Sequence, residues 1–258
     1  MNIKAVFFDI DGTLVSFKNH KMPASTKEAL WQLHNNGIKI FIATGRFKDG
    51  LEVLGDIPFD GYITLNGQYC YTNKEVVYEN FIEKEDLASL LEVLDEQPFP
   101  CGFTMKTGKI YNYKDKRVAE IHSITHNDDQ PTGDLSRVLD EKVYQLMCFV
   151  SKQEEEKLLE KMPHCTSARW HPLFTDVTPL GGTKQLGIDK FLSYYNIDRQ
   201  ETMAFGDGGN DLQMLNHVAH GIAMGNGEEQ LKQIAEYVCD DVDHDGIVKA
   251  LRHYELIK

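Results

Sequence analysis

Two aspartates near the N-terminus are the residues best placed to do chemistry. Asp9 and Asp11 stand in the segment Asp9–Thr13, directly after the apolar run Ala5–Phe8. Side chains alternate along a strand, so both carboxylates project to one side at its carboxyl end. They repel each other unless a cation lies between them, and Mg²⁺ suits hard oxygen ligands. A simple turn would explain Asp11 followed by Gly12, but it leaves Asp9 without a reason.

Two more polar motifs follow short apolar strands. Thr44–Arg46 comes after Ile38–Ala43, and Gly206–Asp211 comes after Thr202–Phe205. In an open parallel sheet, ligands bind beyond the carboxyl ends of the strands, so we expect these motifs to meet in one crevice. Lys184, at the start of a predicted helix, adds a cation. Carboxylates, a hydroxyl and a lysine are together the parts of a phosphoryl-transfer site.

The elements that carry these motifs alternate between strand and helix in the two outer parts of the chain. Ser25 and Glu28 have capping-box spacing and predict the start of a helix, which Gly37 is expected to end. Residues 47–55 are also expected to be helical. This order is typical of a parallel sheet covered on both faces. The predicted fold class is therefore α/β, with a doubly wound, Rossmann-like core.

The middle of the chain has a different texture. An amphipathic helix is predicted at Glu83–Gln97 and a strong strand at Lys142–Val150, but strands and helices there do not alternate regularly. Such a pattern favours an α+β module inserted into the α/β domain. We expect a core made of residues 1–81 and 183–258, and an inserted domain made of residues 82–182.

Composition and charge exclude several classes of protein. A hydrophobic content of 41% is ordinary for a globular chain, and a net charge of −13 argues against a general nucleic-acid or anionic-membrane binder. No apolar run approaches a membrane span, and the N-terminus enters a strand at once, unlike a signal peptide. The five cysteines show no C-x-x-C spacing. We expect a cytoplasmic protein whose partner is a small phosphorylated molecule.

In their order, these motifs resemble those of the haloacid dehalogenase (HAD) superfamily. The stretches that carry the resemblance are Asp9–Thr13, Thr44–Arg46, Lys184 and Gly206–Asp211. Their spacing, with an α+β insertion between the second and third motifs, is similar to that of Cof-type phosphatases with a type IIB cap. The resemblance runs over the full chain, and its third motif is identified mainly by position.

The resemblance, together with the chemistry of the residue types, implies a role for each acid. Asp9 is expected to attack phosphorus and become an aspartyl-phosphate. Asp11 is expected to protonate the leaving alkoxide and then to take a proton from water. In this family the backbone carbonyl at the position of Asp11 also binds Mg²⁺. Asp9 and Asp207 are the expected carboxylate ligands, with Asp211 either binding the ion or orienting its ligands.

The remaining motif residues are expected to bind phosphate. The Thr44 hydroxyl and the Gly45 N–H would hold phosphate oxygens, and Lys184 would offset the charge that grows on them. Thr44 and Lys184 thereby complete the expected catalytic set. Asn210 either bonds the phosphate or steadies Lys184.

Several other polar residues are interpreted as structural. Arg46 is left out of the catalytic set, as a surface or supporting cation. Arg169, Trp170 and His171 in the inserted module favour satisfied or exposed structural roles over substrate contact. The acidic run at residues 240–245 lacks calcium-loop spacing and a closing glutamate, so it is interpreted as an acidic loop.

The activity that the resemblance implies is Mg²⁺-dependent hydrolysis of a small phosphorylated metabolite. Sugar phosphates are the commonest class, with nucleotide and cofactor phosphates also open, and the insertion is expected to close over the site as a cap. A phosphomutase or phosphotransferase could use the same aspartyl-phosphate. The sequence alone names neither the physiological substrate, nor the cap residues that set specificity, nor the oligomeric state.

Two alternatives belong to other functional classes. A signalling receiver module carries an acidic pair on its first strand but is phosphorylated on a later strand, and it has no counterpart of the insertion. A catalytically idle binding protein would be expected to have lost one of its active acids or its lysine. Asp9, Asp11, Lys184 and Asp207 are all present. We therefore favour the enzyme.

Overall fold

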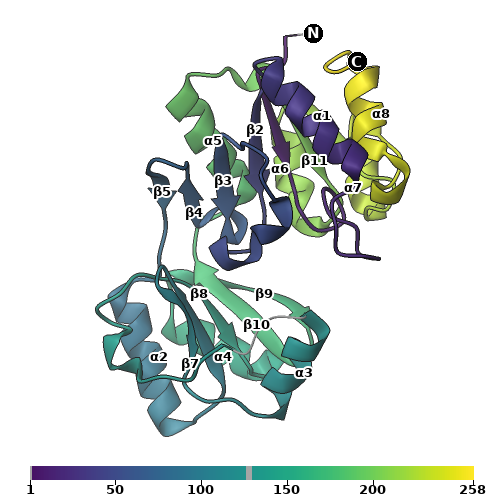
Figure 1. The fold of residues 1–258 in the computed structure, drawn as a ribbon. Helices are drawn as coiled ribbons and strands as arrows, with labels where there is room; N and C mark the ends of the chain where they lie inside the picture. The colour runs from purple at the N-terminus through teal and green to yellow at the C-terminus, as the bar shows by residue number, and fades with distance from the viewer. Residues whose placement is uncertain (1, 126–129) are drawn as a thin grey trace. The chain divides into compact units, whose positions relative to one another are not determined.

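The computed structural model describes residues 2–125 and 130–258. The chain divides into two compact units. Met1–Glu79 and Gly182–Lys258 form the first, called here the core unit, and Asn80–Gly181 form the second, called the inserted unit. Both units are drawn in Figure 1.

The core unit is built on an eight-stranded sheet, in the order β13-β12-β11-β1-β2-β3-β4-β5. Its strands are β1 (Ala5–Phe8), β2 (Lys39–Ala43), β3 (Gly61–Thr64), β4 (Tyr69–Tyr71), β5 (Val76–Glu79), β11 (Thr202–Gly206), β12 (His220–Ala223) and β13 (Tyr237–Val238). The six strands from β13 to β3 run parallel, and β4 and β5 add an antiparallel edge. The predicted α/β class is confirmed.

Helices cover both faces of this sheet, as Figure 1 shows. They are α1 (Ala24–Asn35), α5 (Lys184–Tyr195), α6 (Leu212–His217), α7 (Glu229–Ile234) and α8 (Gly246–His253). Val6 and Phe8 of β1 pack into the core formed with α1 and α8, whereas Ala5 and Phe7 pack into the core formed with α5, α6 and α7. Because both faces of β1 are buried, its sequence is an unbroken apolar run rather than an alternation.

The sheet order places β1 between β2 and β11. The chain moves from β1 to one side through β2 and β3, and later returns to fill the other side through β11, β12 and β13. Such a reversal leaves a crevice at the carboxyl ends of the central strands. The motifs that follow β1, β2 and β11 all lie at this edge.

One local prediction is wrong and another holds only in part. Helix α1 begins at Ala24, after Pro23, and Ser25 donates its hydroxyl proton to Asp245 instead of capping the helix. Residues 47–55 form two 3₁₀ turns, Lys48–Gly50 and Glu52–Leu54, rather than one α-helix. The Gly50 carbonyl, which a continuous α-helix would pair with the N–H of Leu54, accepts a bond from the Arg46 side chain. Gly37 does follow α1 with φ +78°, as predicted.

The inserted unit contains a five-stranded antiparallel sheet in the order β7-β6-β8-β10-β9. Its elements are α2 (Lys84–Glu96), β6 (Cys101–Met105), β7 (Gly108–Tyr111), α3 (Lys116–Thr125), β8 (Val143–Cys148), α4 (Lys152–Lys161), β9 (Cys165–His171) and β10 (Phe174–Pro179). Leu87, Leu90 and Leu158, from α2 and α4, pack on one face of the sheet, and Val118 and Ile121 of α3 pack on the other.

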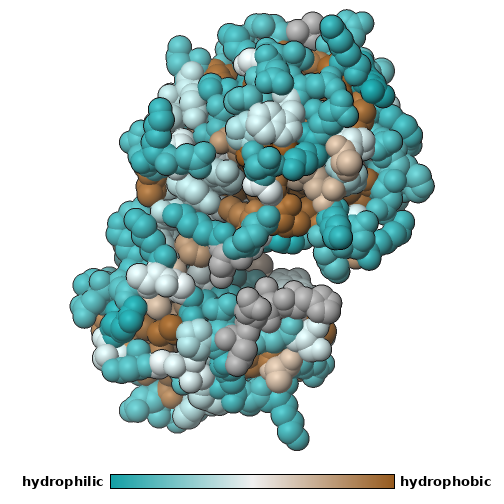
Figure 2. Space-filling view, in the orientation of Figure 1, coloured by the Kyte–Doolittle hydropathy of each residue, from teal (hydrophilic) through white to brown (hydrophobic). Residues whose placement is uncertain are grey.

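The surface in the view of Figure 2 is mostly hydrophilic, with apolar residues showing in small separate areas on both units. Within the parts of the chain that the structure describes, no helix combines the length and the apolar character needed to cross a bilayer.

Candidate active site

Three adjacent strands bring the first, second and fourth predicted motifs to one edge of the core sheet. Asp9 follows the end of β1, Thr44 follows β2, and Asp207 follows β11. The register pairs Phe8 with Phe205 on one side and with Ile42 on the other, so the three strands end nearly level. The sheet itself therefore fixes where these side chains begin.

Three carboxylates form a compact cluster at this edge. One oxygen from each of Asp9, Asp207 and Asp211 lies within 4.8 Å of the other two, and all three residues are buried. Asp211 ends the short 3₁₀ turn Gly209–Asp211, and its Oδ2 accepts the N–H groups of Asp207 and Gly208 at 3.0 Å each. These bonds hold the Asp211 carboxylate rigidly beside the other two acids.

Lys184 lies between two of these acids. Its side chain is completely buried, and Nζ donates to Oδ1 of Asp9 and to Oδ1 of Asp211, each at 2.6 Å. Thr183 caps helix α5 by accepting the N–H of Leu186, which sets Lys184 at the first residue of the helix. The third motif, found in the sequence mainly by its position, thus lies in direct contact with the first and fourth.

The electrostatics of this cluster show a deficit of positive charge. Burial, followed by the neighbouring charges of Asp211 and Asp207, raises the pKa of Asp9 to about 8, although Lys184 opposes the shift. Burial and Asp211 likewise raise the pKa of Asp207 to about 7. Burial acts to lower the pKa of Lys184, but Asp211 and Asp9 outweigh it and raise that pKa. One ammonium group does not compensate three carboxylates.

Gly12 allows Asp207 to reach the cluster. It has φ +79°, and a Cβ atom built on it would lie 2.1 Å from Oδ2 of Asp207 and 2.6 Å from Cε2 of Phe17. A side chain at this position would therefore displace the carboxylate as well as strain the backbone. The Thr13 hydroxyl donates a 3.3 Å hydrogen bond to Oδ1, the other oxygen of the Asp207 carboxylate.

The Asp11 carboxylate does not join this cluster. It is 42% exposed and forms a two-pronged ion pair with Arg46, whose Nη2 and Nε donate to the two carboxylate oxygens at 2.6 and 2.9 Å. The sequence predicts Arg46 only as a surface or supporting cation and gives no partner for it. Its place directly after the strand beside β1 was the signal that could have predicted this pair.

The expected phosphate-binding residues are linked by a residue that sequence analysis missed. Thr44 is buried, with its Oγ1 accepting the N–H of Arg46 at 3.1 Å. A Cβ atom on Gly45 would meet the amide of Asn66 at 3.3 Å, and that same amide accepts a 3.1 Å bond from Asn210. Asn66 has φ +52° in the turn after β3, where the sequence suggested only the end of a strand. Asn210 is thus tied to Asn66.

Comparison with known proteins matches residues 6–251 to the model of a family described as haloacid dehalogenase-like hydrolase. This match covers nearly the whole chain. The chain belongs to the haloacid dehalogenase-like hydrolases. The resemblance inferred from the four motifs is therefore confirmed.

Several relatives of this hydrolase are phosphatases of the same superfamily or are named as putative phosphatases. "Putative phosphatase YkrA" of Bacillus subtilis (strain 168) is 37% identical over 260 residues, covering 100% of both chains. A phosphatase of the superfamily from Bacteroides thetaiotaomicron is 36% identical, with a TM-score of 0.89 over 99% of this chain and 96% of its own. A subclass IIB sugar phosphatase is 42% identical, with a TM-score of 0.84 over 98% and 100%. The prediction of an enzyme of the HAD phosphatase class is confirmed.

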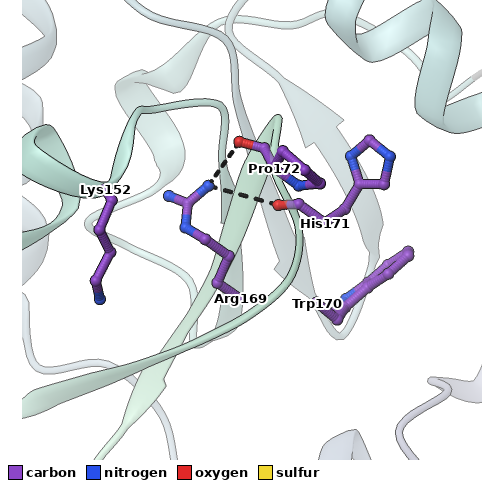
Figure 3. Close-up of a pocket in the computed structure, with 5 residues that line it drawn as sticks. All are labelled: Lys152, Arg169, Trp170, His171 and Pro172. Atoms are coloured by element: carbon purple, nitrogen blue, oxygen red, sulfur yellow. Dashed lines mark hydrogen bonds between the residues drawn. The ribbon is translucent and has the colours of Figure 1, made fainter.

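The inserted unit of the hydrolase has a shallow hollow of about 470 Å³, lined by Lys152, Arg169, Trp170, His171 and Pro172 (Figure 3). Arg169 donates to the carbonyls of Pro172 and His171, at 2.9 and 3.5 Å, and to the Glu155 carboxylate at 2.7 Å. Trp170 is 57% exposed. Because the arginine is engaged by the protein itself, it braces the turn after β9, in line with the structural role expected for it.

Proposed function

We propose that this hydrolase is a Mg²⁺-dependent phosphatase that acts on a small phosphorylated metabolite, with sugar phosphates as its substrate class, through an aspartyl-phosphate on Asp9. The observation that carries this proposal is the buried group of Asp9, Asp207, Asp211 and Lys184. This group brings together a nucleophile, a fixed cation and more carboxylates than the single ammonium can neutralise.

The acid cluster fits a magnesium ion. Its donors are carboxylate oxygens, which suit a hard cation, and burial together with the neighbouring carboxylates raises the pKa values of Asp9 and Asp207. Asp9, Asp207 and Asp211 would hold the ion together with the backbone carbonyl of Asp11. When bound, Mg²⁺ supplies positive charge that offsets the negative charge of the phosphoryl group.

In the first step, a carboxylate oxygen of Asp9 attacks phosphorus and the bond to the leaving oxygen breaks, with Asp11 supplying a proton to that oxygen. In the second step, water attacks the aspartyl-phosphate and gives its proton to Asp11, and Asp9 is released as a carboxylate. Thr44, the Gly45 N–H and Asn210 bind the phosphoryl oxygens, and Lys184 offsets their growing charge.

Sugar phosphates are proposed as the substrate class because a structural neighbour that is 42% identical over nearly the whole chain is a sugar phosphatase. A cytoplasmic location is proposed because all five cysteines are free and buried, as suits a reducing compartment. Transfer of the phosphoryl group to a sugar acceptor instead of water would use the same residues. Adding sugar acceptors to the assay and looking for new phosphate esters separates the two reactions.

The test is hydrolysis of 4-nitrophenyl phosphate by the full chain, followed by a panel of sugar, nucleotide and cofactor phosphates. We expect activity with Mg²⁺ that EDTA abolishes, and no measurable turnover by Asp9→Asn. Asp56→Asn removes an exposed aspartate that pairs with Lys27, so it serves as the matched control and should keep wild-type activity. Activity in EDTA, or an active Asp9→Asn variant, would sink the proposal.

A further inference from the structure

Arg46 is bound to Asp11 more completely than an ordinary surface arginine is bound to an acid. Two of its nitrogens meet the two Asp11 oxygens, and its third nitrogen, Nη1, donates to the Gly50 carbonyl at 2.6 Å. This parallel pairing fixes both the position and the plane of a carboxylate, which a lysine cannot do.

The backbone on both sides of the pair is also held in place. Arg46 accepts the N–H of Leu65 at 3.0 Å and donates its own N–H to Thr44 at 3.1 Å. On the other side, Gly12 donates its N–H to the Val15 carbonyl at 2.9 Å, which closes the turn that follows Asp11. The guanidinium and the carboxylate therefore meet from two anchored segments.

Stability alone is a poor explanation for this arrangement. The side chains of Arg46 and Asp11 are 30% and 42% exposed, and an ion pair with that much contact with water adds little to the free energy of unfolding. What the pair does provide is a fixed direction for a carboxylate that the proposed mechanism uses twice.

We propose that Arg46 is a positioning residue that holds Asp11 in the orientation in which it accepts a proton from the hydrolytic water. This inference rests on the proposed function, because it assigns a support to the second step of that reaction. In that step, a lone pair of the water oxygen forms a bond to phosphorus and the water proton moves to Asp11. The bond from phosphorus to the Asp9 oxygen breaks, and its electron pair returns to the Asp9 carboxylate.

The pairing suits this second step better than the first. Both oxygens of Asp11 already accept N–H bonds from Arg46, and each keeps a further lone pair that can accept a proton from water. The effect of removing Arg46 is therefore expected to fall mainly on breakdown of the aspartyl-phosphate.

An aryl phosphate separates the two steps experimentally. Nitrophenolate leaves without needing a proton, so formation of the aspartyl-phosphate from 4-nitrophenyl phosphate proceeds without help from Asp11. With Mg²⁺ present, we expect Arg46→Ala to lower steady-state turnover by about 10–100-fold while its initial burst approaches about one nitrophenolate per enzyme. Acid quenching and intact-mass measurement should find more phosphoenzyme in the variant than in the wild type. A merely structural role would lower the melting temperature without trapping phosphoenzyme.

Two further variants test whether Arg46 acts through Asp11. The double variant Arg46→Ala/Asp11→Asn should turn over no more slowly than Asp11→Asn alone. Arg46→Lys, which keeps the charge but lacks the planar fork, should trap phosphoenzyme to an intermediate extent, and it serves if Arg46→Ala does not fold. Arg199→Ala removes an arginine of the same unit that donates to the His217 carbonyl, and should behave as wild type.

Three results would overturn the inference. The first is an Arg46→Ala variant with a raised KM, slow nitrophenolate release and no burst. The second is a double variant in which the losses of turnover from Arg46→Ala and Asp11→Asn multiply. The third is turnover at the wild-type rate in the Arg46 variants. Failure of the proposed function itself looks different. In that case neither the wild-type enzyme nor the Arg46 variants would acquire a phosphoryl group on Asp9.

Discussion

The two units treat a buried carboxylate in opposite ways. Glu155 of the inserted unit is 2% exposed and accepts bonds from Ser167, Arg169 and Lys152 at 2.6, 2.7 and 3.3 Å. Burial acts to raise the pKa of Glu155, but these three donors outweigh it and hold the pKa below its ordinary value. The Asp9 side chain of the core unit is also buried, at 8% exposed, yet its pKa rises to about 8.

The difference lies in what surrounds each acid. Glu155 has more cationic partners than it needs, so the protein alone satisfies it. Asp9 shares the single ammonium of Lys184 with Asp211, and Asp207 lies close by as a third acid. A carboxylate whose charge is balanced by protein donors serves the structure, whereas one whose charge is not balanced can still bind a positively charged ligand. Four predictions test this contrast.

Removing the one buried cation should have the largest effect. Lys184→Met is expected to lower kcat by about 10²–10³-fold, the usual loss when a donor to developing negative charge is removed. It should also destabilise the metal-free protein by ~3–5 kcal/mol, because buried charges are left unpaired. Steady-state assays and denaturant unfolding measure the two effects. Wild-type kcat in this variant would show that Lys184 is only a structural counterion.

Neutralising one acid in each unit should shift stability in opposite directions. Glu155→Gln is expected to destabilise the protein by ~3 kcal/mol, because it breaks a buried, fully bonded ion pair. Asp9→Asn should stabilise the metal-free protein, because it removes a charge that its surroundings disfavour. Urea unfolding of both variants in EDTA at pH 8 gives the signs. If both variants lose stability, the contrast between the two sites is wrong.

The pH dependence of stability should carry the same signature. Because the pKa values of Asp9 and Asp207 are raised in the folded state, that state keeps protons that the unfolded chain has already released above about pH 4. Stability of the metal-free protein should therefore fall as pH rises from about 4 to about 8. The loss should be at least ~1 kcal/mol, which is a few degrees in Tm for a chain of this size. Thermal melts in EDTA across this range test it, and a Tm that rises towards pH 8 contradicts it.

The most local change crowds the acid cluster sterically. Gly12→Ala would press a methyl group against Asp207, whereas Gly37→Ala has nearly the same φ, +78°, and no described atom within 4 Å of the added carbon. Gly37→Ala thus carries the backbone strain without the clash. We expect Gly12→Ala to be less stable by a further ~1–2 kcal/mol. It should also need more Mg²⁺ for half-maximal activity. Equal stability and equal Mg²⁺ demand in the two variants would show that Asp207 relaxes freely.

The sequence predicted the parts of this site that depend on strand ends. Asp9, Asp207 and Thr44 follow apolar strands, and the rule for parallel sheets brings such positions to one edge. Lys184 is identified mainly by its position, at the start of a predicted helix that follows the inserted module. These predictions depend on the backbone path alone, which the hydrophobic pattern determines.

What the sequence did not predict depends on how side chains cross between loops. The pairing of Arg46 with Asp11 joins residues 35 positions apart, and the bond from Asn210 to Asn66 joins residues 144 apart. Neither contact leaves a periodic signal. Arg46 also donates to the carbonyl of Gly50, within the segment 47–55 that forms two 3₁₀ turns. Local helix propensity carries no information about side chains that bond to the segment through tertiary contacts.

Lys184 also bears on whether the chain can fold in the absence of a metal ion. An ammonium group built into the first turn of α5 reaches two of the three acids through bonds that need no ion. We therefore expect the chain to fold without a metal ion, unlike small domains that are unfolded without theirs. Because Lys184 is a counterion that belongs to the chain itself, we expect chelation to abolish activity reversibly and to leave the fold intact.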